Sequence, residues 1–229
     1  MALIHVVRVW LLSPEQDVAF LLAFAFIPAR YDTSVLGGSL PGGTAADVWT
    51  FVSYALVHAD WMHFFVNAIW LLPFGSALAR RFGTGRFLAF LAVTAAAGAA
   101  AHLAVHAGGR APMIGASAAI SGTMAAAMRF AFQPGGPLNL WRTGSDIDYR
   151  VPALPLTGVL REPAVIGFLA VWFAINLIFG VGSLPIAGEG QSVAWQAHIG
   201  GFLAGLLLFS WFDPAADFRQ FHDGDATRH

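Results

Sequence analysis

Five long apolar segments, separated by short polar stretches, dominate the pattern of hydrophobic and polar positions along the chain. A membrane-spanning helix needs about 20 mostly apolar residues, and each segment reaches or approaches that length. The pattern therefore predicts five transmembrane helices, at residues 61–79, 86–107, 113–133, 164–182 and 193–212. The apolar run at residues 1–12 is too short to span a membrane alone, so we predict that it is the end of a sixth, truncated helix or a distorted short one.

The remaining segments predict one interfacial helix and two loops. Ser13-Pro14-Glu15-Gln16 is typical of a helix start, with Ser at the N-cap, Pro at the first position and Gln at the third. We expect the helix that follows, at about 14–27, to lie in the membrane interface or to pack on the bundle. Residues 30–50 and 134–162 are rich in loop-forming residues and predict irregular loops, and we assign no role to the second loop.

Composition supports a membrane protein with a single all-α, polytopic domain. The chain is 57% hydrophobic and only 11% charged, whereas soluble globular chains are about 25% charged. The expected division of residues 1–229 has four parts: a partial first helix at 1–12, an external loop and interfacial helix at 14–50, a five-helix core at 61–212, and a cytoplasmic tail at 213–229. The net charge of −1 gives no polybasic surface for nucleic acid, and the lack of Cys excludes disulfides and a Cys nucleophile.

Arginine placement predicts the orientation of the chain in the membrane. If the helices alternate in direction, nine arginines fall on one side and Arg30 and Arg110 fall on the other, with Arg8 ambiguous. The positive-inside rule assigns the nine to the cytoplasm: Arg80, Arg81, Arg86, Arg129, Arg142, Arg150, Arg161, Arg219 and Arg228. We therefore expect residues 30–60 to lie on the external side. The short chain without extra domains suits a multi-pass protein of the bacterial inner membrane, whose external side is the periplasm.

Few polar side chains interrupt the apolar segments, and such groups need partners or a function. They are His63, Asn67, Ser117, Ser121, Asn176, Gln196 and His198. No Asp or Glu lies in mid-helix, and no HExxH motif is present. A zinc peptidase of that type, aspartyl chemistry and a proton-coupled transporter are therefore disfavoured.

The alternating topology places His63, Ser117 and His198 at a similar depth, in the outer third of the membrane. A hydroxyl is a weak nucleophile until a base takes its proton, so Ser117 is a candidate nucleophile and His198 a candidate base. The candidate donors to an oxyanion include the free N–H groups at the start of the Ser117 helix. They also include the side chains of His63 and of Asn67, which lies one helical turn after His63. With no acid available to orient His198, we expect a dyad rather than a triad.

Glycines are predicted to shape the backbone around these residues. Gly115 permits a backbone conformation closed to other residues just before Ser117. Gly201 and Gly205 form a GxxxG motif, which allows close helix contact. We expect this motif to pack the His198 helix against the Ser117 helix.

Three linked motifs resemble the rhomboid family of intramembrane serine proteases. They are His58-Ala-Asp-Trp-Met-His63-Phe-Phe-Val-Asn67, then Gly115-Ala-Ser117, then Ala197-His198-Ile-Gly-Gly201-Phe-Leu-Ala-Gly205. Ala118 and Ser121 depart from the residues common in that family. The resemblance covers about residues 50–212 and implies a bundle of six membrane helices around a water-filled cavity open to the outside.

The resemblance also implies an activity, which is hydrolysis of peptide bonds in or beside the transmembrane helix of membrane protein substrates. It implies neither metal nor nucleotide as a cofactor. By resemblance, Ser117 is the nucleophile and His198 the general base, with His63, Asn67 and the Ser117 amide forming the oxyanion hole. Substrates are expected to be single-pass proteins whose helix contains weak, Gly- or Ala-rich turns.

Alternative interpretations of the same residues remain open. Ser117 taken alone is a typical packing residue of a membrane helix. A non-catalytic rhomboid-like factor that binds membrane proteins is the main alternative function, and a small transporter or channel is a weaker one. His102 and His106 have the spacing of a metal pair, but without a third ligand we favour a position at the interface, where they snorkel.

Overall fold

The structure is a computed structural model that describes residues 1–36, 38–138, 146–180 and 193–214. Within these ranges the regular secondary structure is helical, apart from one isolated bridge between Phe26 and Met113. The α-helices are α1 (Ala2–Trp10), α2 (Pro14–Phe24), α3 (Thr33–Leu36), α4 (Gly43–Ser53), α5 (Trp61–Phe82), α6 (Thr84–Val105), α7 (Ser117–Ala127), α8 (Leu156–Val159), α9 (Pro163–Gly180) and α10 (Trp195–Phe212). The 3-10 turns are η1 (Pro28–Tyr31), η2 (Tyr54–Leu56) and η3 (Asp146–Arg150).

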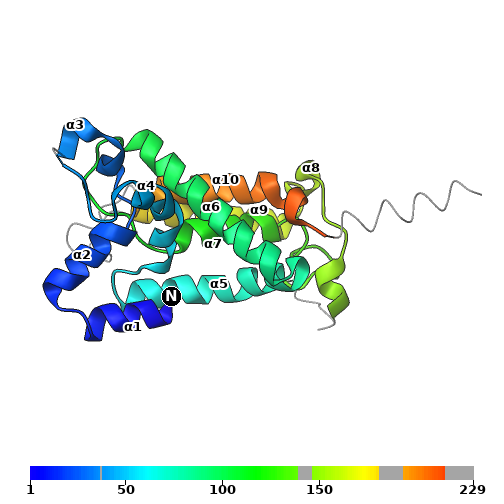
Figure 1. Ribbon diagram of the computed structural model, residues 1–229. Helices are drawn as coiled ribbons and strands as arrows, with labels where there is room; N and C mark the ends of the chain where they lie inside the picture. Colours follow the sequence, from blue (N-terminus) through cyan, green and yellow to red (C-terminus); the bar gives the residue numbers. More distant parts are fainter. Residues whose placement is uncertain (37, 139–145, 181–192, 215–229) are drawn as a thin grey trace, which may run out of the picture.

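Helix α7 is the central element of the bundle. It packs against α5, α6 and α10, and every residue from Ala118 to Ala127 is buried. Figure 1 shows α7 between these longer helices, with α1 to α4 gathered at one end of the bundle and α8 at the other. Ser117 therefore lies at the end of the bundle where the N-terminal helices gather, as the first residue of a fully enclosed helix.

The long helices follow the predicted segments closely, with one clear exception. The segment predicted as a helix at 113–133 is helical only from Ser117 to Ala127. Residues before Ser117 are not helical because Met113 exchanges backbone hydrogen bonds with Phe26, and Gly115 has a φ of +118°. The prediction of a full-length helix was therefore wrong at its start, and also at its end, because α7 stops at Ala127. The non-helical approach leaves Ser117 at a helix N-terminus.

The N-terminal region also differs from the prediction in two places. The Ser13–Gln16 capping box is confirmed, but α2 ends at Phe24 because the residues after it are extended and pair with Met113. The segment 30–50, predicted as an irregular loop, contains most of α4. Helix α4 forms because it buries Ala46 and Thr50 against the protein. The sequence did not reveal it because the Gly and Thr residues at its start are typical of a loop.

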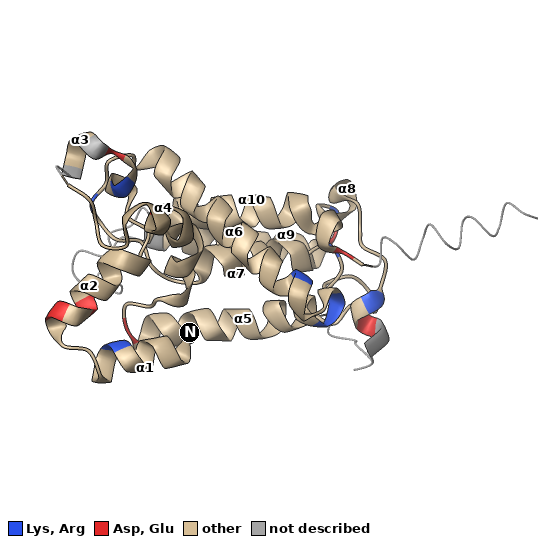
Figure 2. Cartoon of the chain, viewed as in Figure 1, with Lys and Arg blue, Asp and Glu red and all other residues tan. Residues whose placement is uncertain are grey.

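Two helices of the described part, α5 and α6, are long and apolar enough to cross a membrane. In each, only 28% of the apolar window is buried within the protein, so each helix leaves apolar side chains at the surface. On α5 the outward residues Met62, Phe65, Ile69 and Leu72 recur at helical spacing. Figure 2 shows the charged residues at the two ends of the bundle, with an uncharged middle. This distribution is that of an integral membrane protein.

Small residues bring α7 and α10 into backbone contact. A Cβ atom on Gly201 would overlap the carbonyl oxygen of Ala118, and one on Gly205 would overlap that of Gly122. Membrane helices associate through such close packing because lipid tails leave no hydrophobic force between them. The predicted pairing of the Ser117 and His198 helices is therefore confirmed.

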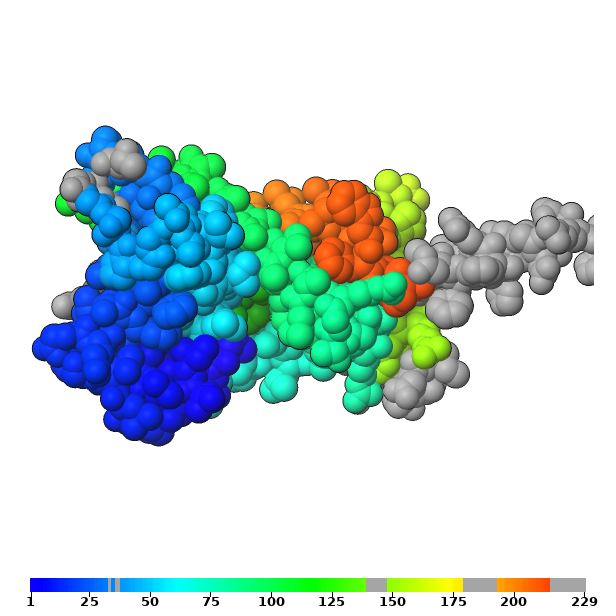
Figure 3. All heavy atoms as spheres, viewed as in Figure 1, coloured from blue at the N-terminus to red at the C-terminus, as the bar shows by residue number. Residues whose placement is uncertain are grey.

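Buried arginines fix the two ends of the bundle. At one end, Arg8 donates to both carboxylate oxygens of Asp17, at 2.7 and 3.0 Å, and to the carbonyl oxygen of His58, at 2.6 Å. These bonds join α1, α2 and the loop before α5. The blue N-terminal residues form one continuous mass in Figure 3. At the other end, Arg81 forms a bidentate ion pair with Asp213, with both N···O distances 2.9 Å.

Candidate active site

Ser117 and His198 meet across the α7–α10 contact. The Oγ atom of Ser117 lies 2.7 Å from Nε2 of His198, although 81 positions separate them in sequence. Each side chain projects from the first turn of its helix, so the glycine contacts that join the helices also set this distance. The expected approach of the hydroxyl and the imidazole is confirmed. At this distance the serine hydroxyl donates a hydrogen bond to Nε2 when that nitrogen carries no proton.

The other ring nitrogen of His198 also has a partner, which the sequence analysis did not anticipate. Nδ1 lies 2.6 Å from Oδ1 of Asn176, and Nδ2 of Asn176 donates to the carbonyl oxygen of Trp172 at 2.8 Å. The sequence analysis expected a dyad because no acid is available to orient His198, and it assigned no catalytic role to Asn176. The signal was present, because Asn176 is one of the few polar residues within an apolar segment.

His63 lies beside the backbone that leads into Ser117. A Cβ atom placed on Gly115 would be 2.6 Å from Nε2 of His63 and 3.8 Å from Oγ of Ser117. The backbone N–H of Ala59 donates to Nδ1 of His63 at 3.4 Å, so a neutral His63 carries its proton on Nε2. The structure thus places a ring N–H donor next to Gly115, on the approach to the serine.

Two further predicted donors have defined surroundings. Asn67 is buried one turn after His63, and its Nδ2 donates to the His63 carbonyl oxygen at 2.8 Å. The amide has a second N–H that this bond leaves available. The backbone N–H of Ser117 opens α7 and has no acceptor within the helix.

Other polar residues from the sequence analysis have structural contacts. The hydroxyl of Ser121 donates to the carbonyl oxygen of Ser117 at 2.8 Å, a bond within α7. The rings of His102 and His106 stack with centroids 4.4 Å apart. Among the described residues, no group of three His, Cys, Asp or Glu side chains has the arrangement of a metal site.

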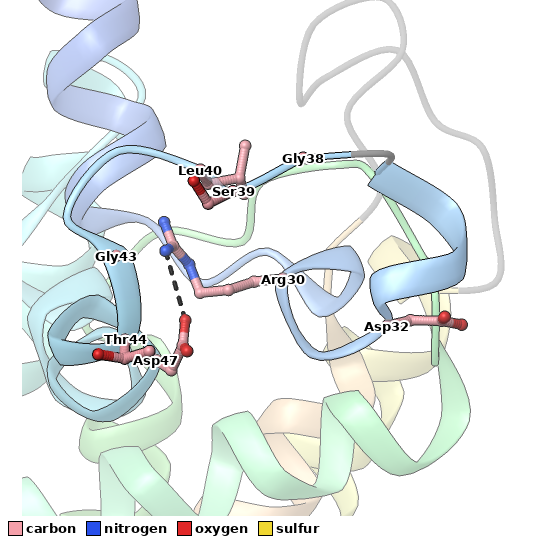
Figure 4. Close-up of a pocket in the computed structure, with 8 residues that line it drawn as sticks. All are labelled: Arg30, Asp32, Gly38, Ser39, Leu40, Gly43, Thr44 and Asp47. Atoms are coloured by element: carbon pink, nitrogen blue, oxygen red, sulfur yellow. Dashed lines mark ion pairs between the residues drawn. The ribbon is translucent and has the colours of Figure 1, made fainter.

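A pocket of about 360 Å³ lies in the N-terminal loops, away from Ser117 and His198 (Figure 4). Its lining residues are Arg30, Asp32, Gly38, Ser39, Leu40, Gly43, Thr44 and Asp47. Arg30 pairs with Asp47 at 3.5 Å and donates to the carbonyl oxygens of Leu22 and Pro41, at 2.5 and 3.2 Å. These bonds hold the loop against α2 and α4, which is a structural role for Arg30.

Comparison with known proteins gives a family match over most of the chain. The family model described as the Rhomboid domain matches residues 45–213. The chain is also similar to the rhomboid protease GlpG of Yersinia pestis (strain Pestoides F), with 27% identity over 166 residues, and to that of Yersinia enterocolitica, with 26% over 167 residues. Each alignment covers 72% of this chain and 48% of the relative, so the chain spans about half the length of these relatives.

Proposed function

This chain belongs to the rhomboid family, and from that premise we propose that it is an intramembrane serine endopeptidase. The observation that carries the proposal is the 2.7 Å separation between Oγ of Ser117 and Nε2 of His198. A base within hydrogen-bond reach is what converts a serine hydroxyl into a nucleophile. The names of the similar proteins, both rhomboid proteases, support the same reaction class.

In the proposed reaction, Oγ of Ser117 attacks the carbonyl carbon of a peptide bond while His198 takes the hydroxyl proton at Nε2. The carbonyl oxygen becomes an oxyanion, for which the Ser117 N–H, the ring N–H of His63 and the free amide N–H of Asn67 are the candidate donors. Such donors are typically worth about 2.7–4 kcal/mol each. When the intermediate collapses, His198 returns the proton to the leaving amine. His198 then takes a proton from a water molecule, which attacks the acyl-enzyme and releases Ser117.

The substrate is a membrane protein whose transmembrane helix contains weak, Gly- or Ala-rich turns. A helix satisfies all of its backbone groups internally, so its carbonyls are accessible only where it unwinds. Helix α7 begins at Ser117, at the end of the bundle that the arginine distribution assigns to the external side. In this orientation, in a bacterial inner membrane, water reaches the serine from the periplasm.

The bundle itself is proposed to be one rhomboid-like membrane domain of six helices. Helices α5, α6, α7, α9 and α10 are five of them, and α1 belongs to the first. Neither metal nor nucleotide takes part in the proposed chemistry. We therefore expect a chelator to leave the cleavage rate unchanged.

The direct test uses purified protein in liposomes with a single-pass substrate and a fluorophosphonate probe. Wild type is expected to cleave the substrate and to become labelled at Ser117, whereas Ser117→Ala and His198→Ala lose both reactions. Ser76→Ala is the matched control, because it removes a serine hydroxyl from a membrane helix far from His198. Cleavage by Ser117→Ala at the wild-type rate would show that another residue is the nucleophile. Substrate binding without turnover by wild type would favour a non-catalytic binding protein.

A further inference from the structure

Both ring nitrogens of His198 are within hydrogen-bond distance of a side chain, so their protonation states are linked. Nε2 faces the Ser117 hydroxyl at 2.7 Å, and Nδ1 faces Oδ1 of Asn176 at 2.6 Å. An amide oxygen only accepts hydrogen bonds, so Nδ1 must carry a proton. In the neutral ring Nε2 is then the unprotonated nitrogen, which is the state that a base requires.

The orientation of the Asn176 amide is fixed by its own helix. Its Nδ2 donates to the carbonyl oxygen of Trp172 at 2.8 Å, and a carbonyl oxygen is only an acceptor. A flipped amide would bring two oxygens together at Trp172. The bonds therefore run in one direction, from the Ser117 hydroxyl to His198, from His198 to Asn176, and from Asn176 to Trp172.

Packing between α9 and α10 holds this chain of bonds in place. Asn176 is 8% exposed and Trp172 is 6% exposed. The Trp172 ring stacks on Phe202 of α10, one turn beyond His198, with centroids 4.6 Å apart. The acceptor for His198 thus sits on a helix whose own position relative to α10 is set by an aromatic contact.

We propose that Asn176 is the positioning residue for His198, so that the centre works as a Ser–His–Asn triad rather than a dyad. This inference rests on the proposed peptidase function. An amide suits the position because a carboxylate is costly inside a membrane, whereas an amide oxygen accepts the Nδ1 proton without a net charge. Its dipole also stabilises the imidazolium that forms when Ser117 is deprotonated.

Removing the acceptor has a specific consequence. In Asn176→Leu, which keeps the branched shape of the side chain, the Nδ1 proton loses its partner. The tautomer with the proton on Nε2 then becomes lower in free energy. A proton on Nε2 blocks deprotonation of Ser117. We expect kcat to fall tenfold or more while KM stays unchanged. The upper limit of the loss is the roughly 10²–10⁴-fold that a general base contributes. Asn176→Asp retains an acceptor oxygen, so it should recover part of the rate that Asn176→Leu loses.

The experiment compares wild type, Asn176→Leu and Asn176→Asp by substrate cleavage and by the rate of fluorophosphonate labelling. Labelling involves no peptide substrate, so it reports the reactivity of Ser117 separately from substrate binding. Thr94→Val is the matched control, because the Thr94 hydroxyl makes a buried bond to the carbonyl oxygen of Phe90, at 2.9 Å, without contacting His198. Rates are normalised to the folded fraction, measured by thermal melting.

Slow labelling of Asn176→Leu, with recovery in Asn176→Asp and a wild-type rate in Thr94→Val, is the expected result. Equal labelling rates in wild type and Asn176→Leu would overturn the positioning role while leaving the peptidase proposal intact. The same role is overturned if Asn176→Asp is as slow as Asn176→Leu. Failure of wild type itself to label at Ser117 would instead overturn the proposed function, and the triad with it.

Discussion

Gly201 of α10 lies directly against the main chain of Ala118 in α7, with no room between them for a side chain. The two residues follow the candidate catalytic pair closely along their helices, since Ala118 comes directly after Ser117 and Gly201 lies one turn after His198. The backbone contact between Gly201 and Ala118 is therefore the nearest structural constraint on the distance between the hydroxyl and the imidazole.

Gly201→Ala is expected to separate the two helices and to slow labelling at Ser117. The added methyl overlaps the carbonyl oxygen of Ala118, a main-chain atom that moves only if a helix moves. Overpacking of this kind costs typically about 1–3 kcal/mol. Thermal melting and fluorophosphonate labelling of the same preparation measure the stability and the reactivity.

Gly167→Ala in α9 is the matched control for that substitution. A Cβ atom on Gly167 meets nothing within 4 Å, so the change should be neutral or stabilise the helix by about 1 kcal/mol through helix propensity. Wild-type melting and labelling of Gly201→Ala would contradict the role of the backbone contact.

Gly115→Ala is expected to lower turnover more than stability. Gly115 has a φ of +118°, and a Cβ atom there would be 2.6 Å from Nε2 of His63, so the ring must move. If His63 is an oxyanion donor, the cleavage rate should fall roughly 10²-fold, the loss typical of removing one such donor. The rate of substrate cleavage in liposomes measures this loss.

The control separates backbone strain from displacement of His63. Gly83 also has a positive φ, +78°, but a Cβ atom there meets nothing within 4 Å. Gly83→Ala should therefore lose a similar amount of stability, about 1–2 kcal/mol, and keep its cleavage rate. Equal losses of activity in the two variants would indicate that strain alone is responsible.

The positions of the long helices were predictable because each has a length of apolar sequence that no loop would carry. Helix α4 was not, since its buried residues Ala46 and Thr50 follow a Gly-rich start that resembles a loop. The start of α7 at Ser117, rather than at residue 113, could not be predicted either. It depends on backbone bonds between Met113 and Phe26, which only the folded chain brings together.

The candidate site was predictable to the extent that motifs and depth in the membrane reveal it. Ser117 and His198 follow from their order, spacing and similar depth, and the structure brings them together. The role of Asn176 was not predictable from residue type, because an amide in an apolar helix is equally suited to a helix contact. Its relation to His198 is set by the crossing of α9 and α10, which sequence patterns do not encode.

Removing either partner of the Arg81–Asp213 ion pair is expected to destabilise the bundle. The pair joins the end of α5 to the residue after α10, and the two side chains are 1% and 6% exposed. Arg81 also donates to the carbonyl oxygens of Tyr149 and Val151, both at 2.9 Å. Because an unpaired buried charge remains, Asp213→Asn should cost about 3–5 kcal/mol.

Thermal melting of purified protein checks this prediction. Arg86→Gln, at an exposed position near the start of α6, should change the melting temperature little, since surface charges contribute about 0–1 kcal/mol. A melting temperature for Asp213→Asn equal to that of Arg86→Gln would mean that the ion pair does not hold the helix ends.

The buried side chain of His58 is expected to make the free energy of unfolding depend on pH. It is fully buried in the loop before α5, and neither ring nitrogen has a hydrogen-bond partner of good geometry among the described residues. Burial, followed by the nearby His63 and His5, lowers the pKa of His58 from 6.5 to about 4. The unfolded chain therefore binds a proton that the folded chain does not bind between pH 6.5 and pH 4.

Because the unfolded state binds more protons in that window, stability rises with pH across it. Wild type should be most stable above pH 6.5 and should lose on the order of 2 kcal/mol as the pH falls to about 4, once solvent screening is allowed for. Melting temperatures measured at intervals between pH 4 and pH 7 test this slope. His58→Leu fills the apolar site without a titratable group, so its melting temperature should depend less on pH. If wild type and His58→Leu have parallel profiles, the acid sensitivity arises from other groups.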